Sequence, residues 1–172
     1  MKKYLLMTSI LASSLMPSFG EATASKSEGT LIFDASIKGG TPDELALKKV
    51  IENNFKVSTN LEATEADFAL YHSKDYIQHV DGKVLNYEQY VTHRKALQKT
   101  VKSVKIVFHD MIVQGNKVVT RHTAYAVKKD DKEIELQVIA IFEIKDGKII
   151  SCHELTHLAK GERADRDLGS RE

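Results

Sequence analysis

The sequence has little cysteine and almost no excess of charge, and both shortages exclude classes of protein. Cys152 is the only cysteine in the 172 residues, so an internal disulfide framework and a cysteine-rich zinc ribbon are excluded. The formal net charge is only +1, whereas nucleic-acid-binding proteins usually carry a basic excess. We therefore expect no nucleic-acid partner. Hydrophobic residues make up 42 % of the chain, which excludes intrinsic disorder and indicates one folded domain.

Residues 1–24 are typical of a signal peptide. Lys2 and Lys3 precede a mostly apolar stretch that is short for a bilayer span, and Ala22 and Ala24 supply the small residues that a signal peptidase reads. We predict cleavage after Ala24 and export, either to the periplasm or out of the cell. An uncleaved anchor is the alternative; after cleavage we expect no stable membrane insertion.

Two capping boxes predict helices in the first part of the chain. Thr41, Pro42 and Glu44 form one helix start, and Asn86 with Gln89 forms another. Apolar residues follow each start at helical spacing, and a short helix is expected between them over 61–71.

Arg94 lies on the apolar stripe of the helix that starts after Asn86. Its long side chain either extends along the apolar surface to water or reaches into a cavity.

From Val101 onward the apolar residues alternate with a period of two, which predicts strands. In the clearest strand the even positions are apolar, and they are Ile134, Leu136, Val138, Ala140, Phe142 and Ile144. In the first strand Val104, Ile106, Phe108 and Ile112 alternate, which predicts that they share one face, and a second strand is expected over 118–128. Asp146-Gly147 is typical of a two-residue hairpin. Helices followed by an antiparallel meander predict an α+β fold, with the helices covering one side of a curved sheet.

Three segments together resemble SnoaL-like proteins of the nuclear transport factor 2 superfamily. Residues 70–79 are similar to the family's LYxxDYxxH segment, residues 115–123 to its GDxVxxRWT strand, and residues 141–149 to its IFRxxDGKI hairpin. The resemblance implies a cone-shaped α+β barrel with an internal pocket between the curved sheet and the helices. It also implies a homodimer formed by the outer sheet face, where Ile139 and Ile141 would lie.

Composition and the resemblance together give the expected organisation of the chain. Residues 25–40 are expected to be an extended arm or linker, and residues 41–158 the SnoaL-like domain. Residues 159–172 form a charged tail, which reads as a solvated end or a short helix, or as a clamp for a partner subunit.

Glu154 is the candidate catalytic residue. If the even positions of the last strand face inward, Glu154 is a carboxylate in an apolar cavity, and desolvation would raise its pKa and make it a general acid or base. The resemblance agrees, because SnoaL-type cyclases carry their acid/base aspartate at this distance beyond the DGK turn. The histidine that partners it in those cyclases corresponds to Ala140 here. The alternative is a rim carboxylate that is paired with a cation or orients a ligand.

Five other residues are candidate ligand contacts. Tyr76 and His79 match positions that line the pocket mouth in the family, and Tyr90 could present its hydroxyl to a ligand. His122 replaces the usual tryptophan and could lie on either face of its strand, and Cys152 lies beside Glu154. The alternative for each is a structural role in the core.

His153-Glu154-Leu155-Thr156-His157 also matches the zinc peptidase signature H-E-x-x-H. That chemistry needs a helix, which places both histidines on one face. This segment reads as a strand, in which residues four apart are separated by about 13 Å.

The sequence therefore favours an exported domain that binds a small, largely apolar molecule. As an enzyme, it would use Glu154 for isomerisation, cyclisation, dehydration or hydrolysis, without a metal or an organic cofactor. The alternative is a non-catalytic ligand-binding or interaction module, and the minor alternative is a zinc metallopeptidase.

Overall fold

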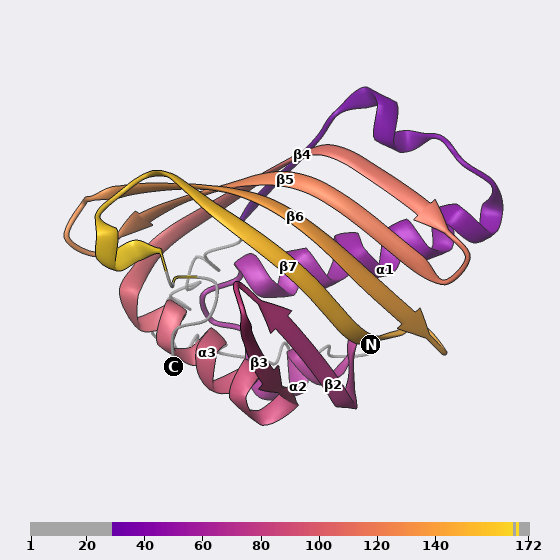
Figure 1. The fold of residues 1–172 in the computed structure, drawn as a ribbon, viewed down its shortest axis with the longest axis horizontal. Coiled ribbons are helices and arrows are strands. Elements are labelled where there is room, and N and C mark those ends of the chain that lie inside the picture. The colour runs from indigo at the N-terminus through magenta and orange to yellow at the C-terminus, as the bar shows by residue number, and fades with distance from the viewer. Residues whose placement is uncertain (1–28, 167, 169–172) are drawn as a thin grey trace, which may run out of the picture.

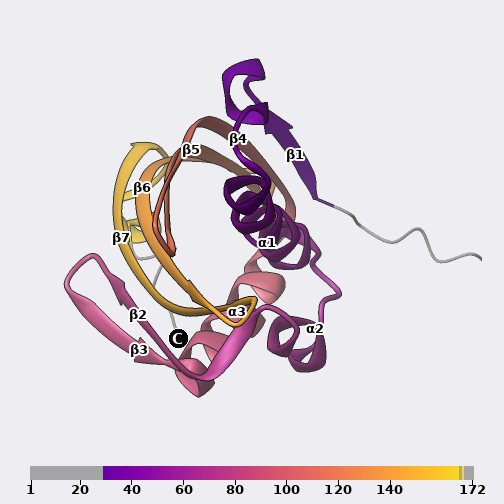
Figure 2. The same cartoon turned by 90° about the vertical axis from the view of Figure 1, so that its right-hand side faces the viewer.

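The computed structural model describes residues 29–166 and 168, where three helices pack on a curved, mixed sheet of seven strands (Figures 1 and 2). The predicted signal peptide lies outside the described residues. The helices are α1 (Pro42–Thr59), α2 (Glu65–Ala69) and α3 (Tyr87–Thr100), with short 3-10 turns η1 (Ala35–Lys38) and η2 (Arg163–Asp165). The strands are β1 (Thr30–Phe33), β2 (His72–Val80), β3 (Lys83–Asn86), β4 (Val101–Gln114), β5 (Lys117–Lys128), β6 (Glu133–Lys145) and β7 (Lys148–Lys160).

The strand order is β1-β4-β5-β6-β7-β2-β3. The predicted antiparallel meander is confirmed for β4 to β7, whereas β1 pairs with β4 and β2 pairs with β7 in parallel. The sheet curves around α1 without closing into a barrel (Figure 2). The predicted α+β class, with helices on one side of a curved sheet, is confirmed.

Both predicted capping boxes are formed. The Thr41 hydroxyl accepts from the backbone N–H of Glu44 at 3.3 Å, and the Glu44 carboxylate accepts from the N–H of Thr41 at 2.8 Å. Asn86 and Gln89 make the same reciprocal pair at 2.9 and 3.1 Å. These bonds satisfy N–H groups that have no partner inside the helix, which is why both helices begin where the sequence indicates.

Part of the predicted arm is built into the sheet. β1 pairs with β4 from Thr30↔Lys105 to Phe33↔Phe108, and the rings of Phe33 and Phe108 stack with centroids 4.8 Å apart. The partner strand is far away along the chain, so no local pattern in these few residues indicates the pairing.

Two β-bulges change which residues face inward. In β4 the register shifts between Phe108 and Asp110, so Met111 is buried and Ile112 is 61 % exposed. The prediction that Ile112 shares the face of Phe108 is therefore wrong. In β7 the even positions, which begin with Ile150, were expected to face inward, but a register shift near the hairpin buries Ile149 completely instead. Each bulge inserts one residue, which reverses the alternation beyond it.

The regular alternation of β6 is confirmed, because its even positions from Ile134 to Ile144 are all buried. The hairpin to β7 turns at Asp146 and Gly147, whose φ angles are 51° and 74°. Positive φ at both positions matches the twist that a two-residue hairpin requires. Within residues 29–166, no helix is both long and apolar enough to cross a membrane.

Candidate functional site

A cavity of about 150 Å³ lies between the concave face of the sheet and the helices α1 and α3. Its wall is mostly apolar, with Phe55, Leu97, Val104, Leu136, Val138 and Phe142 among the lining residues. Its volume is that of a cavity that holds a single benzene ring. Five of the six candidate site residues line it, and they are Tyr76, Tyr90, His122, Cys152 and Glu154.

Glu154 projects from β7 toward this cavity. One carboxylate oxygen accepts from the Thr156 hydroxyl at 3.3 Å and the other from the side-chain amide of Gln78 at 3.4 Å. Burial raises the pKa of Glu154 to about 7, and the nearby Asp81 carboxylate adds to the rise. The hydrogen bonds from Thr156 and Gln78 and the positive charge of Arg94 oppose it. A carboxyl group with such a pKa can take up or release a proton near neutral pH.

Tyr76 and Cys152 form a neutral part of the wall. Both side chains are buried and hydrogen-bond to each other, and burial raises the pKa of the phenol and of the thiol well above their usual values. Since the thiolate is the nucleophilic form, this Cys152 is unreactive. The Tyr90 ring lies edge-on to the Tyr76 ring with centroids 5.2 Å apart, and its hydroxyl is 3.5 Å from that of Ser58.

His122 faces the cavity from β5. Its Nδ1 lies 3.1 Å from the Thr120 hydroxyl, and its ring packs edge-on against Phe55 with centroids 5.0 Å apart. Burial lowers the pKa of His122 to about 4, so the ring is neutral at pH 7. A neutral imidazole can hydrogen-bond a ligand without adding charge to the cavity.

His79 does not line the cavity, and this is a correction to the sequence-based interpretation. Its side chain is exposed on the outer face of the sheet and stacks on His153 of β7, with ring centroids 4.3 Å apart. The inward positions of β2 are Tyr76, Gln78 and Val80, because side chains alternate along a strand. Gln78 therefore contacts the cavity where His79 was expected.

The zinc peptidase alternative does not fit the structure. The whole H-E-x-x-H segment lies in β7, where His153 and His157 are exposed on one face and Glu154 points to the other. The helix that would bring both histidines to one metal ion is not formed. Among residues 29–166 and 168, no group of three or more histidine, cysteine, aspartate or glutamate side chains could hold a metal ion.

Several polar lining residues were not assigned to the site from the sequence, and four of them project from different parts of the wall. Asn54 and Arg94 come from otherwise apolar helix faces, Gln78 from β2, and His72 from the start of β2. The Arg94 side chain reaches into the cavity, which was one of its two predicted positions. Its guanidinium donates to the backbone carbonyl of Ser58. A polar residue on an apolar stripe was the available signal for Asn54.

His72 is held by local contacts. Its Nδ1 is 3.1 Å from the carbonyl of Phe68, so Nδ1 carries the proton that is donated in this bond. Burial lowers the pKa of His72 to about 4, which makes the ring neutral at pH 7.

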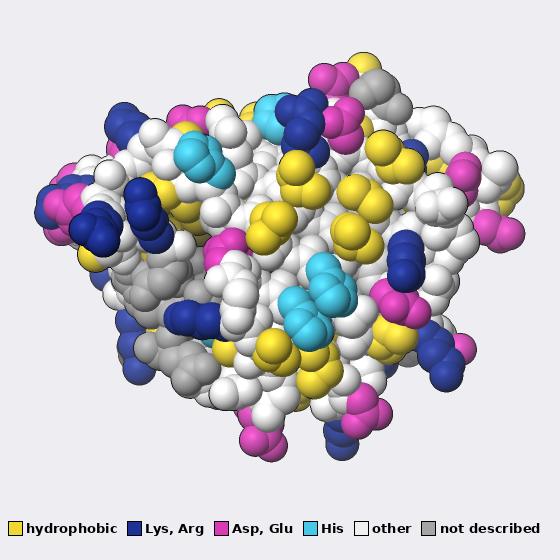
Figure 3. Space-filling model, in the orientation of Figure 1, with side chains coloured by type: hydrophobic (Ala, Val, Ile, Leu, Met, Phe, Trp, Pro, Cys, Tyr) yellow, Lys and Arg dark blue, Asp and Glu magenta, His cyan; other side chains and the backbone are white. Residues whose placement is uncertain are grey.

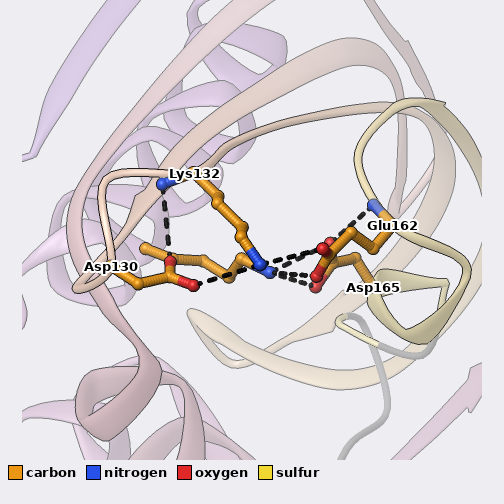
Figure 4. Close-up of polar contacts among 5 residues, drawn as sticks. Asp130, Lys132, Glu162 and Asp165 are labelled. Carbon is orange, nitrogen blue, oxygen red and sulfur yellow. Dashed lines mark hydrogen bonds and ion pairs between the residues drawn. The ribbon is translucent and has the colours of Figure 1, made fainter.

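The C-terminal segment completes one end of the cavity. The buried Asp165 accepts from the Lys128 ammonium at 3.2 Å, and Glu162 accepts from Lys128 at 3.1 Å and from Lys132 at 2.8 Å (Figure 4). These ion pairs hold η2 against the turn between β5 and β6. Leu168 follows and is buried in the cavity wall. This part of the charged tail therefore forms a short 3-10 turn that ion pairs hold against the domain.

The chain matches known proteins at the level of sequence and of fold. Residues 61–152 match the family model described as a SnoaL-like domain. An uncharacterised protein of Schizosaccharomyces pombe is 34 % identical over 120 residues, which cover 70 % of this chain and 92 % of the relative.

Solved structures share the fold at low sequence identity. A candidate SnoaL-like polyketide cyclase from Jannaschia sp. CCS1 has a TM-score of 0.59 at 13 % identity, over 69 % of this chain and 90 % of the other. An LEH-like epoxide hydrolase of Mycobacterium tuberculosis has a TM-score of 0.57 at 17 % identity, over 67 % and 86 %. The match of the family model over more than half of the chain shows that this protein belongs to the SnoaL-like domain family.

Proposed function

We propose that this protein is an exported enzyme that binds a small, largely apolar molecule and transfers a proton with Glu154 as general base. The observation that carries the proposal is a carboxyl group with a pKa near 7 at an apolar cavity. In this role the carboxylate removes a proton from the ligand, and the resulting acid returns it elsewhere. Glu154 supplies the base itself, so this chemistry needs neither a metal nor an organic cofactor.

The neighbouring side chains support that role. Gln78 and Thr156 each donate to one oxygen of Glu154, so the carboxylate has a defined orientation. Tyr76, Tyr90, His122 and Cys152 would contact the ligand. The fold is shared with proteins named as a polyketide cyclase and an epoxide hydrolase, which supports a ligand-binding cavity at this place. Export rests on the composition of residues 1–24.

A second candidate function is ligand binding without catalysis. Ala140 lies directly across from Glu154 in the β6–β7 ladder and is completely buried. A residue with a methyl side chain cannot act as the partner of an acid/base pair. Glu154 would then only orient a ligand by accepting its hydrogen bond.

Proton exchange at carbon distinguishes the two functions. We expect the protein to catalyse deuterium incorporation next to the carbonyl of cyclohexanone in D₂O, measured by NMR, because a general base removes that proton and returns a deuteron. The rate should rise with pH and level off above an apparent pKa of about 7. Ligand binding without exchange above the buffer rate would instead support the non-catalytic module.

We also propose that the outer face of the sheet forms a homodimer. Ile112, Ile139, Ile141 and Leu155 are 61, 55, 41 and 71 % exposed there. They are contiguous, because Ile139 pairs with Leu155, and Val119 pairs with both Ile112 and Ile141. Figure 3 shows the hydrophobic side chains gathered on this face. A patch of this kind on a strand face suits a two-fold contact with its own copy.

The dimer is tested by light scattering at micromolar concentration. We expect a dimer for the native chain and a monomer for Ile139→Lys, because the contact would bury an introduced charge on each subunit. Leu70→Lys, at a leucine that is 61 % exposed beyond α2, should leave the dimer unchanged. A native protein that is monomeric at this concentration would contradict the proposal.

A further inference from the structure

Three polar atoms on the cavity wall are buried and have no hydrogen-bond partner among the described residues. They are Asn54 Oδ1 on α1, Gln78 Oε1 on β2 and Arg94 Nε on α3. A buried polar atom that is left unpaired costs more free energy than a hydrogen bond contributes, and native proteins keep few such atoms. Three of them around one cavity are therefore positions at which a bound molecule can supply the missing partners.

Arg94 and Asn54 belong to one polar group on the helical side of the cavity. The Arg94 guanidinium crosses from α3 and donates to the carbonyl of Ser58. Asn54 lies one turn before Ser58 on α1, so both residues are on the same face of that helix. A cationic N–H donor and an amide oxygen acceptor thus come from neighbouring positions of the same wall.

Gln78 provides the third unpaired atom on the opposite, sheet side. Its side-chain N–H donates to Glu154, and this bond orients the amide so that its oxygen is the free end. A second acceptor is therefore available beside the carboxylate. The remaining lining is mostly apolar, so the polar contacts are few and specific.

The chemistry of these atoms defines what the ligand must carry. Arg94 Nε needs an acceptor, and a guanidinium favours an oxygen with partial or full negative charge. Asn54 Oδ1 and Gln78 Oε1 need donors, which an uncharged ligand supplies as hydroxyl groups. The cavity volume of about 150 Å³ limits the ligand to the size of one ring.

We propose that the cavity takes a hydroxy-substituted carbonyl compound of single-ring size, with its carbonyl oxygen at Arg94 and a hydroxyl at Asn54. The oxygen of Gln78 accommodates a second hydroxyl on the sheet side. This proposal rests on the proposed function in one respect, which is that the ligand occupies the same cavity beside Glu154. It explains why polar side chains from three separate elements point into an otherwise apolar space.

Binding of three related probes tests the ligand class. Dissociation constants are measured by NMR titration for 2-hydroxycyclohexanone, cyclohexanone and cyclohexanol. We expect the hydroxyketone to bind at least about tenfold more tightly than either single-group analogue, because it satisfies both Arg94 Nε and Asn54 Oδ1. Equal affinities for the three probes, or no binding of any at millimolar concentration, would overturn the proposal.

Two variants assign the groups to their partners. Arg94→Met should weaken the two ketones about tenfold and leave cyclohexanol unchanged. Asn54→Leu should weaken the two alcohol-bearing probes and leave cyclohexanone unchanged. The unaffected probe shows in each case that the cavity is still folded. A variant that weakens all three probes alike would show a structural role and overturn the assignment.

The same probes separate this proposal from the proposed function. Selective binding of the hydroxyketone without deuterium exchange would support the ligand class and contradict proton transfer by Glu154. Exchange without any preference among the three probes would support proton transfer and contradict the ligand class.

Discussion

Replacement of Glu154 by glutamine is expected to lower the rate of deuterium exchange by about 10²–10⁴-fold, the usual contribution of a general base. The amide has nearly the same shape but cannot take up a proton. Its oxygen can still accept from Gln78, and the Thr156 hydroxyl can rotate to accept from the new N–H group. The cavity should therefore stay intact, so that the affinity for a probe changes much less than the rate.

The matched control is Glu88→Gln, at an exposed carboxylate on α3 outside the cavity, which should leave the rate unchanged. Exchange assays and probe titrations on both variants provide the comparison. A Glu154→Gln protein that binds the probe and exchanges at the native rate would show that Glu154 is not the base. If Glu154→Gln lost both exchange and all probe binding, the result would show that Glu154 has a structural role.

The same variant should change how stability depends on pH. Because the pKa of Glu154 is raised from about 4.5 to about 7 in the folded protein, the folded state binds more protons than the unfolded state between these values. Its contribution to the free energy of unfolding therefore falls as pH rises through this window, by about 3 kcal/mol. Glu154→Gln removes this loss, so its stability relative to the native chain should rise from pH 4.5 to pH 7 in thermal melts.

His72 and His122 have the opposite effect on the pH dependence of stability. Their pKa values are lowered to about 4 in the folded state, so the unfolded state binds more protons between about 4 and 6.5. Their contribution to stability is present above this window and is lost as pH falls through it. The difference between the variant and the native chain, measured at each pH, cancels this shared contribution.

Phe108→Ala is expected to lower the free energy of unfolding by about 3–5 kcal/mol, because truncation of a buried phenylalanine removes its burial and leaves a cavity. The Phe108 side chain is fully buried. Its ring stacks on Phe33 of β1 and meets the edge of Phe55 of α1, each with centroids 4.8 Å apart. One side chain therefore joins the edge strand, the meander and the long helix, and urea unfolding should report its loss.

Ile112→Ala on the same strand is the control. Ile112 is 61 % exposed beyond the bulge, and surface substitutions usually change stability by less than about 0.5 kcal/mol. The measurement is made where the native chain and the variant have the same oligomeric state, since Ile112 lies on the proposed dimer face. If both variants lost a similar free energy of unfolding, Ile112 would be a core residue and the bulge in β4 would be contradicted.

Local patterns predicted much of this fold correctly. The capping boxes at Thr41 and Asn86 depend on residues three apart, and the β6 alternation depends on every second residue. Such signals lie within one element, so they can be seen without the rest of the molecule. The resemblance in three ordered segments predicted the family, which the family model confirms.

The errors have one common physical cause. Ile112, Ile150 and His79 were placed by counting positions along a strand or by a motif, and the face of a strand reverses with a shift of one residue. The bulges in β4 and β7 each add one residue, which exchanges the inward and outward positions beyond it. No residue type in these strands indicates where a bulge lies. In β2 the inward position belongs to Gln78, one residue from the histidine that the motif emphasised.

By itself, the sequence determined the class of fold, the family and the strand that carries Glu154, because helix caps and alternation act over a few residues. Only the tertiary structure decided what surrounds that carboxylate. Asn54, Gln78 and Arg94 come from three separate elements, and Leu168 comes from the C-terminal segment. A raised pKa and unpaired polar atoms both depend on burial, and the cavity that buries these groups exists only when these elements pack together.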